Sequence, residues 1–187
     1  MKLNTPTHPE PDPQLLRNAK KGNHEAFAEI VRTYEDLVYS FAFKVCRNKD
    51  KASETLQDTF VNVYRKLDQF NNRAKFTTWL YSIVANNCLM KNRRTKLDEA
   101  SISIDAAPVS HDGDDHDRND VIQEWKSTPL DKLMNNELKD LLDNAIQKLP
   151  GDYRIVFVLR DIEGRSAEET AKILKLTVPA VKSRLRR

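Results

Sequence analysis

The sequence predicts an all-α protein, with two small helical domains joined by a flexible acidic linker. Only four glycines occur in 187 residues, and long stretches without proline also favour helices. Apolar residues recur at i, i+3, i+4 and i+7, which is the spacing of one buried helical face. Over residues 98–128 this period is lost. The predicted divisions are a disordered leader at 1–13, a first domain at 14–97, the linker at 98–128 and a second domain at 129–187.

The first domain is predicted to contain a short helix and three long ones. The short helix runs from Gln14 to near Gly22, a glycine suited to a C-terminal cap. Asn23 can then cap a helix to about residue 46, and the residues NKD at 48–50 should break it. Further helices are expected over about 51–68 and from Phe76 to about residue 96. The inner face of the latter should comprise Phe76, Leu80, Ile83, Val84 and Asn87. Together these helices should form a compact bundle.

The second domain is predicted to end in a helix-turn-helix. Thr128 and Pro129 suit a helix start, and an amphipathic helix should follow to residue 148. The next helix, YRIVFVLRDI, should be broken at Gly164. Ser166 and Glu169 have the spacing of a capping box, which predicts a helix at 167–174, a turn at 175–177 and a final helix after it.

The linker is strongly acidic, with nine carboxylates from Asp98 to Glu124. Runs of like charge are typical of flexible segments. His111 and His116 lie among these acids, but their spacing fits neither a zinc site nor an EF-hand, so a solvated charge run is expected rather than a metal site.

Several classes of protein are disfavoured by motif and composition. There is no Gly-rich phosphate loop, GxGxxG, HExxH or nucleophile elbow, so we expect no enzymatic activity and no cofactor. No apolar run approaches the roughly 20 residues of a membrane span, and the start of the chain lacks a signal peptide. Cys46 and Cys88 are expected to be solitary core thiols in a reducing compartment. The prediction is a cytoplasmic protein without a membrane partner.

The stretch from Phe70 to Lys96 contains no acidic residue. A polyanion bound along it would explain this, because carboxylates would oppose phosphate binding. Between its basic ends are aromatic and amide residues that we expect to be exposed, and unpaired bases stack on aromatic side chains. The alternative is an ordinary basic helix on a core. The residues concerned are Arg73, Lys75, Phe76, Trp79, Tyr81, Asn86, Asn87, Lys91, Arg93, Arg94 and Lys96.

The final helix has a basic outward face, and no carboxylate follows Glu169. A recognition helix of this kind enters the major groove and holds phosphates with Arg and Lys. The alternative is a basic C-terminus that complements the helix dipole. The predicted face comprises Lys182, Ser183, Arg184, Arg186 and Arg187. One domain suited to unpaired bases and one suited to duplex DNA suggest a protein that holds a duplex at one place and opens it at another.

These runs resemble bacterial RNA polymerase sigma factors of the extracytoplasmic-function (ECF) group, a subfamily of the sigma-seventy family, nearly from end to end. In the first domain the matching runs are AKKGNHEAFAEIVRTYEDLVYSFA, ETLQDTFVNVYRKLDQF and FTTWLYSIVANN, followed by KNRR. In the second domain they are LPGDYRIVFVLRDIEGRSAEETAKIL and TVPAVKSRLRR. The resemblance implies a protein that binds core RNA polymerase, directs it to promoters and helps to melt promoter DNA.

The resemblance also implies roles for individual residues. Polymerase clamp helices of the largest subunit would be bound by Glu54, Gln57, Asp58, Phe60 and Tyr64, whose alternative is a solvated helix face. Melted minus-ten DNA would be bound by Lys75, Phe76, Trp79, Asn86, Arg93 and Arg94, although Trp79 could instead belong to the core. The minus-thirty-five element would be read by Lys182, Ser183, Arg184 and Arg187, while the outer face of that domain meets the polymerase flap. The linker would thread through the polymerase cleft and RNA exit path.

Two departures from the family pattern affect these roles. The acidic pattern of the second long helix reads SETLQD, with Ser53 and Thr55 in unusual places. The chain also stops at Arg187, within the recognition helix, where related factors continue. Either the product is truncated, or an additional DNA-targeting factor helps to place it on DNA; an anti-sigma factor is a further expected partner.

Two other functions remain open from the residues alone. The first is a stand-alone helix-turn-helix regulator that binds duplex DNA without polymerase. The second, more remote, is a hydrolase or nuclease built on the Asp- and His-containing linker.

Overall fold

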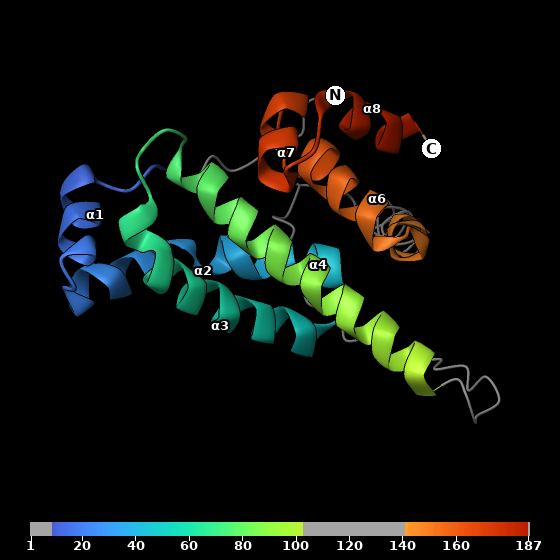
Figure 1. The fold of residues 1–187 in the computed structure, drawn as a ribbon, viewed down its shortest axis with the longest axis horizontal. Helices are drawn as coiled ribbons and strands as arrows, with labels where there is room; N and C mark the ends of the chain where they lie inside the picture. Colours follow the sequence, from blue (N-terminus) through green and yellow to red (C-terminus); the bar gives the residue numbers. More distant parts are fainter. Residues whose placement is uncertain (1–8, 103–140, 187) are drawn as a thin grey trace, which may run out of the picture. The chain divides into compact units, whose positions relative to one another are not determined.

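The computed structural model describes residues 9–102 and 141–186 (Figure 1). Every regular element in these two ranges is helical, which confirms the predicted all-α class. The chain divides into two compact units: one combines Met1–Arg94 with Pro150–Arg187, and the other is Thr95–Leu149. The expected linker, with His111 and His116, lies outside the described residues apart from its start at 98–102.

The first two helices begin where polar side chains satisfy free backbone N–H groups. Helix α1 is Pro13–Lys20, and the Asp12 side chain accepts a hydrogen bond from the Gln14 N–H at 2.8 Å. Helix α2 is His24–Cys46, and Asn23 caps it as predicted by accepting from the Ala26 N–H at 3.0 Å. Gly22, between them, has φ +85°, a conformation that glycine adopts without a steric penalty.

Helix α3 starts earlier than the sequence predicted. It is Lys49–Lys66, followed by a 3₁₀ turn, η1, at Leu67–Gln69. The NKD tripeptide was expected to lie between helices, but Asn48 is the N-cap of α3 and accepts from the Lys51 N–H at 2.8 Å. The break between α2 and α3 is short because Arg47, in the left-handed conformation with φ 55°, reverses the chain in one residue.

Helix α4 is longer than predicted, Phe76–Ile102 rather than ending near residue 96. Its first turn is held by a residue far away in sequence. The Glu10 carboxylate accepts hydrogen bonds from the backbone N–H groups of Phe76 at 2.6 Å and Thr77 at 3.4 Å, and from the Thr77 hydroxyl at 3.0 Å. The neighbouring Pro9 is held against α2 in the same way, because its carbonyl accepts from the Tyr34 hydroxyl at 2.5 Å. Residues 9–13 therefore differ from the disordered leader expected for them.

The core between α2, α3 and α4 is rich in large aromatic side chains. Tyr34 and Phe41 of α2, and Phe76 and Tyr81 of α4, are each at most 2% exposed. Phe41 and Tyr81 meet edge to face with ring centroids 5.0 Å apart, a favoured geometry for aromatic pairs. Burial, followed by the charge of Glu10, raises the pKa of the Tyr34 hydroxyl above its usual value.

The C-terminal part of the first unit contains the predicted helix-turn-helix. Helix α6 is Gly151–Phe157 and passes directly into a π-helical segment, η2, at Val158–Ile162. Helix α7 is Ala167–Leu174, with the Ser166–Glu169 capping box as predicted. Helix α8 is Val178–Arg186. Lys175, in the turn between α7 and α8, is left-handed with φ 54°. Residues 141–148 are helical, and the earlier part of the helix predicted to end at 148 lies outside the described residues.

Within the first unit, Glu163 is a point of contact between η2, α2 and α4. Its carboxylate lies 2.8 Å from the Lys44 ammonium and accepts a 2.7 Å hydrogen bond from the Tyr81 hydroxyl. The Arg165 guanidinium lies 4.7 Å from the centre of the Tyr81 ring, a distance at which a cation is attracted to an aromatic face. Burial and the Glu163 charge raise the pKa of Tyr81.

Among the described helices, none combines the length and apolar character needed to cross a membrane. The described ranges also contain no cluster of three or more side chains suited to hold a metal ion.

Candidate nucleic-acid interface

The exposed face of α3 carries the acidic residues expected to meet a protein partner. Glu54, Gln57 and Asp58 are all exposed and lie within one turn of each other. They are not isolated from the rest of the fold, because the Lys91 ammonium of α4 lies 2.8 Å from Glu54 and 3.1 Å from Asp58. Burial opposes the charge on Lys91, but its hydrogen bonds to these two carboxylates raise its pKa. The carboxylates thus share one partly covered cation.

Phe60 and Tyr64, the two aromatic residues predicted beside these acids, differ in exposure. Phe60 is 8% exposed and belongs to the core, so its side chain supports the α3 face from beneath. Tyr64 is 49% exposed. Its ring meets Phe27 edge to face at 5.0 Å and stacks on His24 at 6.4 Å. Tyr64 is therefore the aromatic side chain that a partner could contact on this face.

The aromatic residues of α4 are less exposed than the sequence suggested. Phe76 was expected both among the exposed aromatics and on the inner face of the helix, and at 1% exposed it lies on the inner face. Tyr81 was expected at the surface but is 2% exposed, and both rings pack against α2. Trp79 is half-buried. Its ring lies 5.1 Å from Phe70 and 5.6 Å from Phe76. Trp79 is thus the accessible edge of an aromatic cluster whose other members are inside.

The two adjacent amides of α4 also point to different environments. Asn86 is exposed, with its amide nitrogen 3.7 Å from the Met90 sulfur. Asn87 was counted among the exposed amides and also placed on the inner face; it is buried, and its side chain donates to the Thr59 hydroxyl at 3.1 Å and accepts from Asn62 at 3.1 Å. This network satisfies a buried amide and ties α4 to α3. Only Asn86 of the pair is free to meet a base.

The predicted phosphate-binding cations of this helix are at the surface. Lys75, before the first turn, and Arg93 and Arg94, about five turns later, are all exposed. They therefore lie at two separate ends of the region that contains Trp79 and Asn86. This spacing suits contacts with two separate phosphate groups of a strand.

The acid-free stretch is not free of carboxylates in space. Glu10 occupies the N-terminus of α4, and Glu54 and Asp58 pair with Lys91 near its middle. The N-terminus of a helix attracts anions, so Glu10 holds a place that a phosphate could otherwise take. Neither the Glu10 cap nor the pairing of Lys91 with Glu54 was predicted, because the partners are 66 and 37 positions apart.

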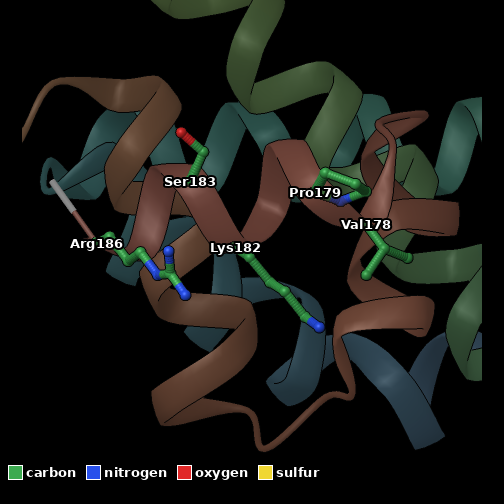
Figure 2. Close-up of a pocket in the computed structure, with 5 residues that line it drawn as sticks. All are labelled: Val178, Pro179, Lys182, Ser183 and Arg186. Carbon is green, nitrogen blue, oxygen red and sulfur yellow. The ribbon is translucent and has the colours of Figure 1, made fainter.

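The second basic surface lies on α8 (Figure 2). Lys182, Ser183 and Arg186 are exposed and line a surface pocket together with Val178 and Pro179. Figure 2 shows Lys182 and Arg186 extending to the same side of the helix, as a spacing of four requires, while Ser183 points away from them.

The remaining predicted residues of α8 are placed differently. Arg184 is half-buried, and its guanidinium donates to the Asp152 carbonyl at 3.5 Å, so it supports the domain. Arg187 lies outside the described residues. Arg186 was predicted on the basic face but was not among the residues assigned to the minus-thirty-five element. Its side chain extends to the same side of α8 as that of Lys182 (Figure 2). Val181, fully buried, anchors the helix.

The comparisons with known proteins agree with this architecture. Residues 30–97 match the family Sigma-70 region 2, and residues 139–187 match Sigma-70, region 4. The chain is 33% identical over 172 residues to the ECF RNA polymerase sigma factor SigW of Bacillus subtilis (strain 168), covering 92% of this chain and 89% of SigW. It is 30% identical over 174 residues to the ECF RNA polymerase sigma-E factor of Escherichia coli (strain K12), covering 93% and 88%.

A solved structure shows the same fold. The sigma factor RpoE from Bartonella quintana, crystallised with the anti-sigma factor NepR, is 21% identical, with a TM-score of 0.61, and the match covers 87% of this chain and 91% of RpoE. The two domain matches in order, together with the identity to SigW over most of both chains, place this protein in a single family: it belongs to the ECF sigma factors of bacterial RNA polymerase.

Proposed function

We propose that this protein binds core RNA polymerase, directs it to promoters and helps to open promoter DNA there. The observation that carries this proposal is the opposite chemistry of two helices in contact. Between Glu54 and Asp58, helix α3 exposes two carboxylates and an amide, whereas α4 exposes cations, an amide and an aromatic edge. A regulator that binds only duplex DNA needs one basic surface; it has no need of an aromatic edge for unpaired bases.

The α3 face is the proposed polymerase-binding surface. Glu54, Gln57, Asp58 and the exposed ring of Tyr64 would meet the clamp helices of the largest subunit, with Phe60 holding the face from the core. Charged groups at the rim of an interface mainly accelerate association and select the partner. Reversing one carboxylate should therefore weaken polymerase binding without unfolding the domain.

The α4 face is the proposed surface for melted minus-ten DNA. Trp79 presents a ring edge supported by Phe70 and Phe76, and stacking of a base on an aromatic side chain contributes about 1–3 kcal/mol. Asn86 would hydrogen-bond an unpaired base. Lys75, Arg93 and Arg94 would neutralise phosphates on either side. Phe76 would act by supporting Trp79 rather than by touching DNA.

The α8 face is the proposed reader of duplex minus-thirty-five DNA. Lys182 and Ser183 are exposed and would reach base edges or phosphates in the major groove. Arg184 would act mainly through its bond to the Asp152 carbonyl. Arg187 and contact of this domain with the polymerase flap stay part of the proposal on family grounds.

Two further expectations concern regulation and location. RpoE from Bartonella quintana was crystallised with the anti-sigma factor NepR, and we propose that this chain is likewise controlled by an anti-sigma factor. A protein that acts with polymerase on promoters works in the cytoplasm. The bond-forming chemistry belongs to polymerase, so this chain is not itself an enzyme.

The decisive experiment separates polymerase binding from DNA opening. The purified chain and two variants, Asp58→Lys and Trp79→Ala, are mixed with core polymerase of the source organism and tested for co-elution and for run-off transcription on a genomic fragment library. Permanganate footprinting of an active fragment then reports open DNA. Glu29→Lys, a charge reversal at an exposed position of α2, is the matched control for Asp58→Lys.

We expect Asp58→Lys to weaken co-elution, and Trp79→Ala to co-elute normally but to lose most open complex. The Glu29→Lys variant should behave as the unmodified chain does. Circular dichroism confirms that each variant is folded at the assay temperature. If the unmodified chain neither co-elutes with polymerase nor starts transcription, but binds duplex DNA tightly, it is a stand-alone regulator instead.

A further inference from the structure

The two cysteines of the chain lie side by side, contrary to the expectation of solitary thiols. Cys46 is the last residue of α2 and Cys88 lies in α4, yet their sulfur atoms are 3.5 Å apart in hydrogen-bond contact. Both are free thiols. A disulfide needs its sulfur atoms about 2 Å apart, so the pair requires only a small approach to form one. The two positions are 42 residues apart in sequence, and nothing in the local pattern indicates their contact.

The two thiols are not equivalent in exposure. Cys88 is fully buried, whereas Cys46 is partly exposed. A small polar oxidant therefore has more direct access to Cys46 than to Cys88. Thr55 of α3 also contacts the pair, with its hydroxyl 4.0 Å from the Cys46 sulfur. This geometry gives one accessible sulfur with a second sulfur immediately behind it.

The electrostatic surroundings shift the pKa values of the two thiols in opposite directions. In the reduced pair the Cys46 thiol donates to the Cys88 sulfur, and once Cys46 has lost its proton the Cys88 thiol can donate to it instead. This hydrogen bond lowers the pKa of Cys46 to about 7; burial opposes the shift, while Thr55 and the charges of Lys91 and Lys51 support it. Conversely, the hydrogen bond to Cys46, together with burial, raises the pKa of Cys88. Cys46 is thus the thiol that ionises near neutral pH, and the thiolate is the nucleophilic form.

A third cation lies close to Cys46. The Arg154 guanidinium donates to the Val45 carbonyl at 2.9 Å. Burial and the charge of Arg47 lower the Arg154 pKa, and the charge of Cys46 acts in the opposite direction. A negative charge on the Cys46 sulfur is therefore attracted by cations from α3, α4 and α6.

We propose that Cys46 and Cys88 form a peroxide-sensitive dithiol, in which Cys46 is oxidised first and Cys88 then closes an intramolecular disulfide between α2 and α4. The Cys46 thiolate attacks one oxygen of hydrogen peroxide; the O–O bond breaks and the Cys46 sulfenic acid forms, while the released hydroxide takes a proton to become water. The Cys88 sulfur then attacks the Cys46 sulfur, the S–O bond breaks, and the Cys88 proton leaves with hydroxide as a second water. Two thiols and one peroxide thus give one disulfide and two waters, with the sulfurs donating two electrons.

This disulfide would lie beneath the acidic face of α3. Cys88 is one turn from Lys91, and Lys91 is the cation that pairs with Glu54 and Asp58. The proposal itself requires no assumption about polymerase, because it concerns only the chemistry of the two sulfurs. Its test is accordingly made on the isolated protein, and it stands or falls independently of the proposed function.

The chain makes the experiment simple, since it has only two cysteines. The reduced full-length protein is treated with hydrogen peroxide at pH 7 and analysed by intact mass and by non-reducing peptide mapping. We expect a loss of two hydrogens, a Cys46–Cys88 cross-linked peptide, and reversal by dithiothreitol. Cys46 should react about tenfold faster than N-acetylcysteine, in line with its larger thiolate fraction at this pH.

Two substitutions of Cys88 test the order of events. Cys88→Ser keeps a hydrogen-bond donor but cannot close the disulfide, so dimedone should trap a Cys46 sulfenic acid in it. Cys88→Ala removes the donor, and its Cys46 should react several-fold more slowly than in Cys88→Ser. Disulfides found only between two chains, or a Cys46 no faster than N-acetylcysteine, would overturn the proposal. Equal Cys46 rates in the two variants would overturn the activating role of Cys88.

Discussion

The two proposed DNA surfaces are held in place in different ways. Helix α4 is fixed by partners distant in sequence: Glu10 at its first turn and the Asn62–Asn87–Thr59 network farther along. Helix α8 is short and rests mainly on Val181, with the Thr177 hydroxyl accepting from the Ala180 N–H at 3.3 Å. A surface that must hold bases outside a duplex needs rigid support, whereas a helix that enters an intact groove is oriented by the groove itself.

The largest effect should come from removing the support beneath Trp79. Phe76→Ala should lower the free energy of unfolding by about 3–5 kcal/mol, because the ring is fully buried between Tyr34, Phe70 and Trp79. Val181→Ala, at the buried position of α8, removes fewer carbon atoms and should cost only about 2 kcal/mol. Urea denaturation measures both values. Equal losses would contradict the view that the two helices differ in how firmly they are held.

The next effect concerns specificity rather than stability. Lys182→Ala should weaken binding to a promoter by about 1–3 kcal/mol if its ammonium contacts a base edge, and competitor sequences should discriminate less at that base pair. Fluorescence anisotropy with promoter variants measures this change. A uniform loss across all sequences would instead assign Lys182 to a phosphate. Lys66→Ala, at an exposed position at the end of α3, serves as the control of equal charge.

A smaller effect should follow from changing the distant cap of α4. Glu10→Gln keeps one acceptor oxygen but replaces the other by a donor that faces the Phe76 or Thr77 N–H. Loss of a cap costs about 1 kcal/mol, and the melting temperature should fall accordingly. Glu29→Gln, exposed on α2, should leave it unchanged. If the melting temperature of the Glu10→Gln variant equals that of the unmodified chain, residues 9–13 contribute little to holding α4.

The smallest effect on stability should come from the ion pairs between α3 and α4. Lys91→Gln should change the free energy of unfolding by less than about 1 kcal/mol, because Glu54 and Asp58 are largely exposed and the pairs are screened by solvent. The same change releases two carboxylates and should alter polymerase association more than stability. Lys66→Gln provides the control. A large loss of stability would mean that Lys91 is a structural anchor of α4 instead.

The features that the sequence predicted well are those determined by near neighbours. The Asn23 cap and the Ser166–Glu169 capping box depend on residues three positions apart, so the helices that follow them begin as expected. The apolar period likewise predicted which helices build the core. The helix predicted over about 51–68 begins two residues earlier, at Lys49, because a tripeptide of polar residues indicates either a break or a cap, and here Asn48 acts as a cap.

The features that were missed depend on contacts distant in sequence. Tyr81 was expected at the surface, but Phe41 and Glu163 surround it. The Glu10 cap, the pairing of Lys91 with Glu54 and the contact of Cys46 with Cys88 could not be predicted, since each joins residues at least 37 positions apart and no local period marks them. Helical periodicity identifies a buried face, but it does not identify which distant side chain covers that face.

The cap that Glu10 provides has a consequence for the order in which the protein folds on the ribosome. Glu10 is synthesised 66 residues before Phe76, whose backbone it caps. At about 5–20 residues per second, the ribosome needs about 3–13 s to make that interval. During this time α1, α2 and α3 can already pack, while the carboxylate has no helix end to bind. The first turn of α4, beside Trp79, is therefore completed only after the rest of its bundle has emerged.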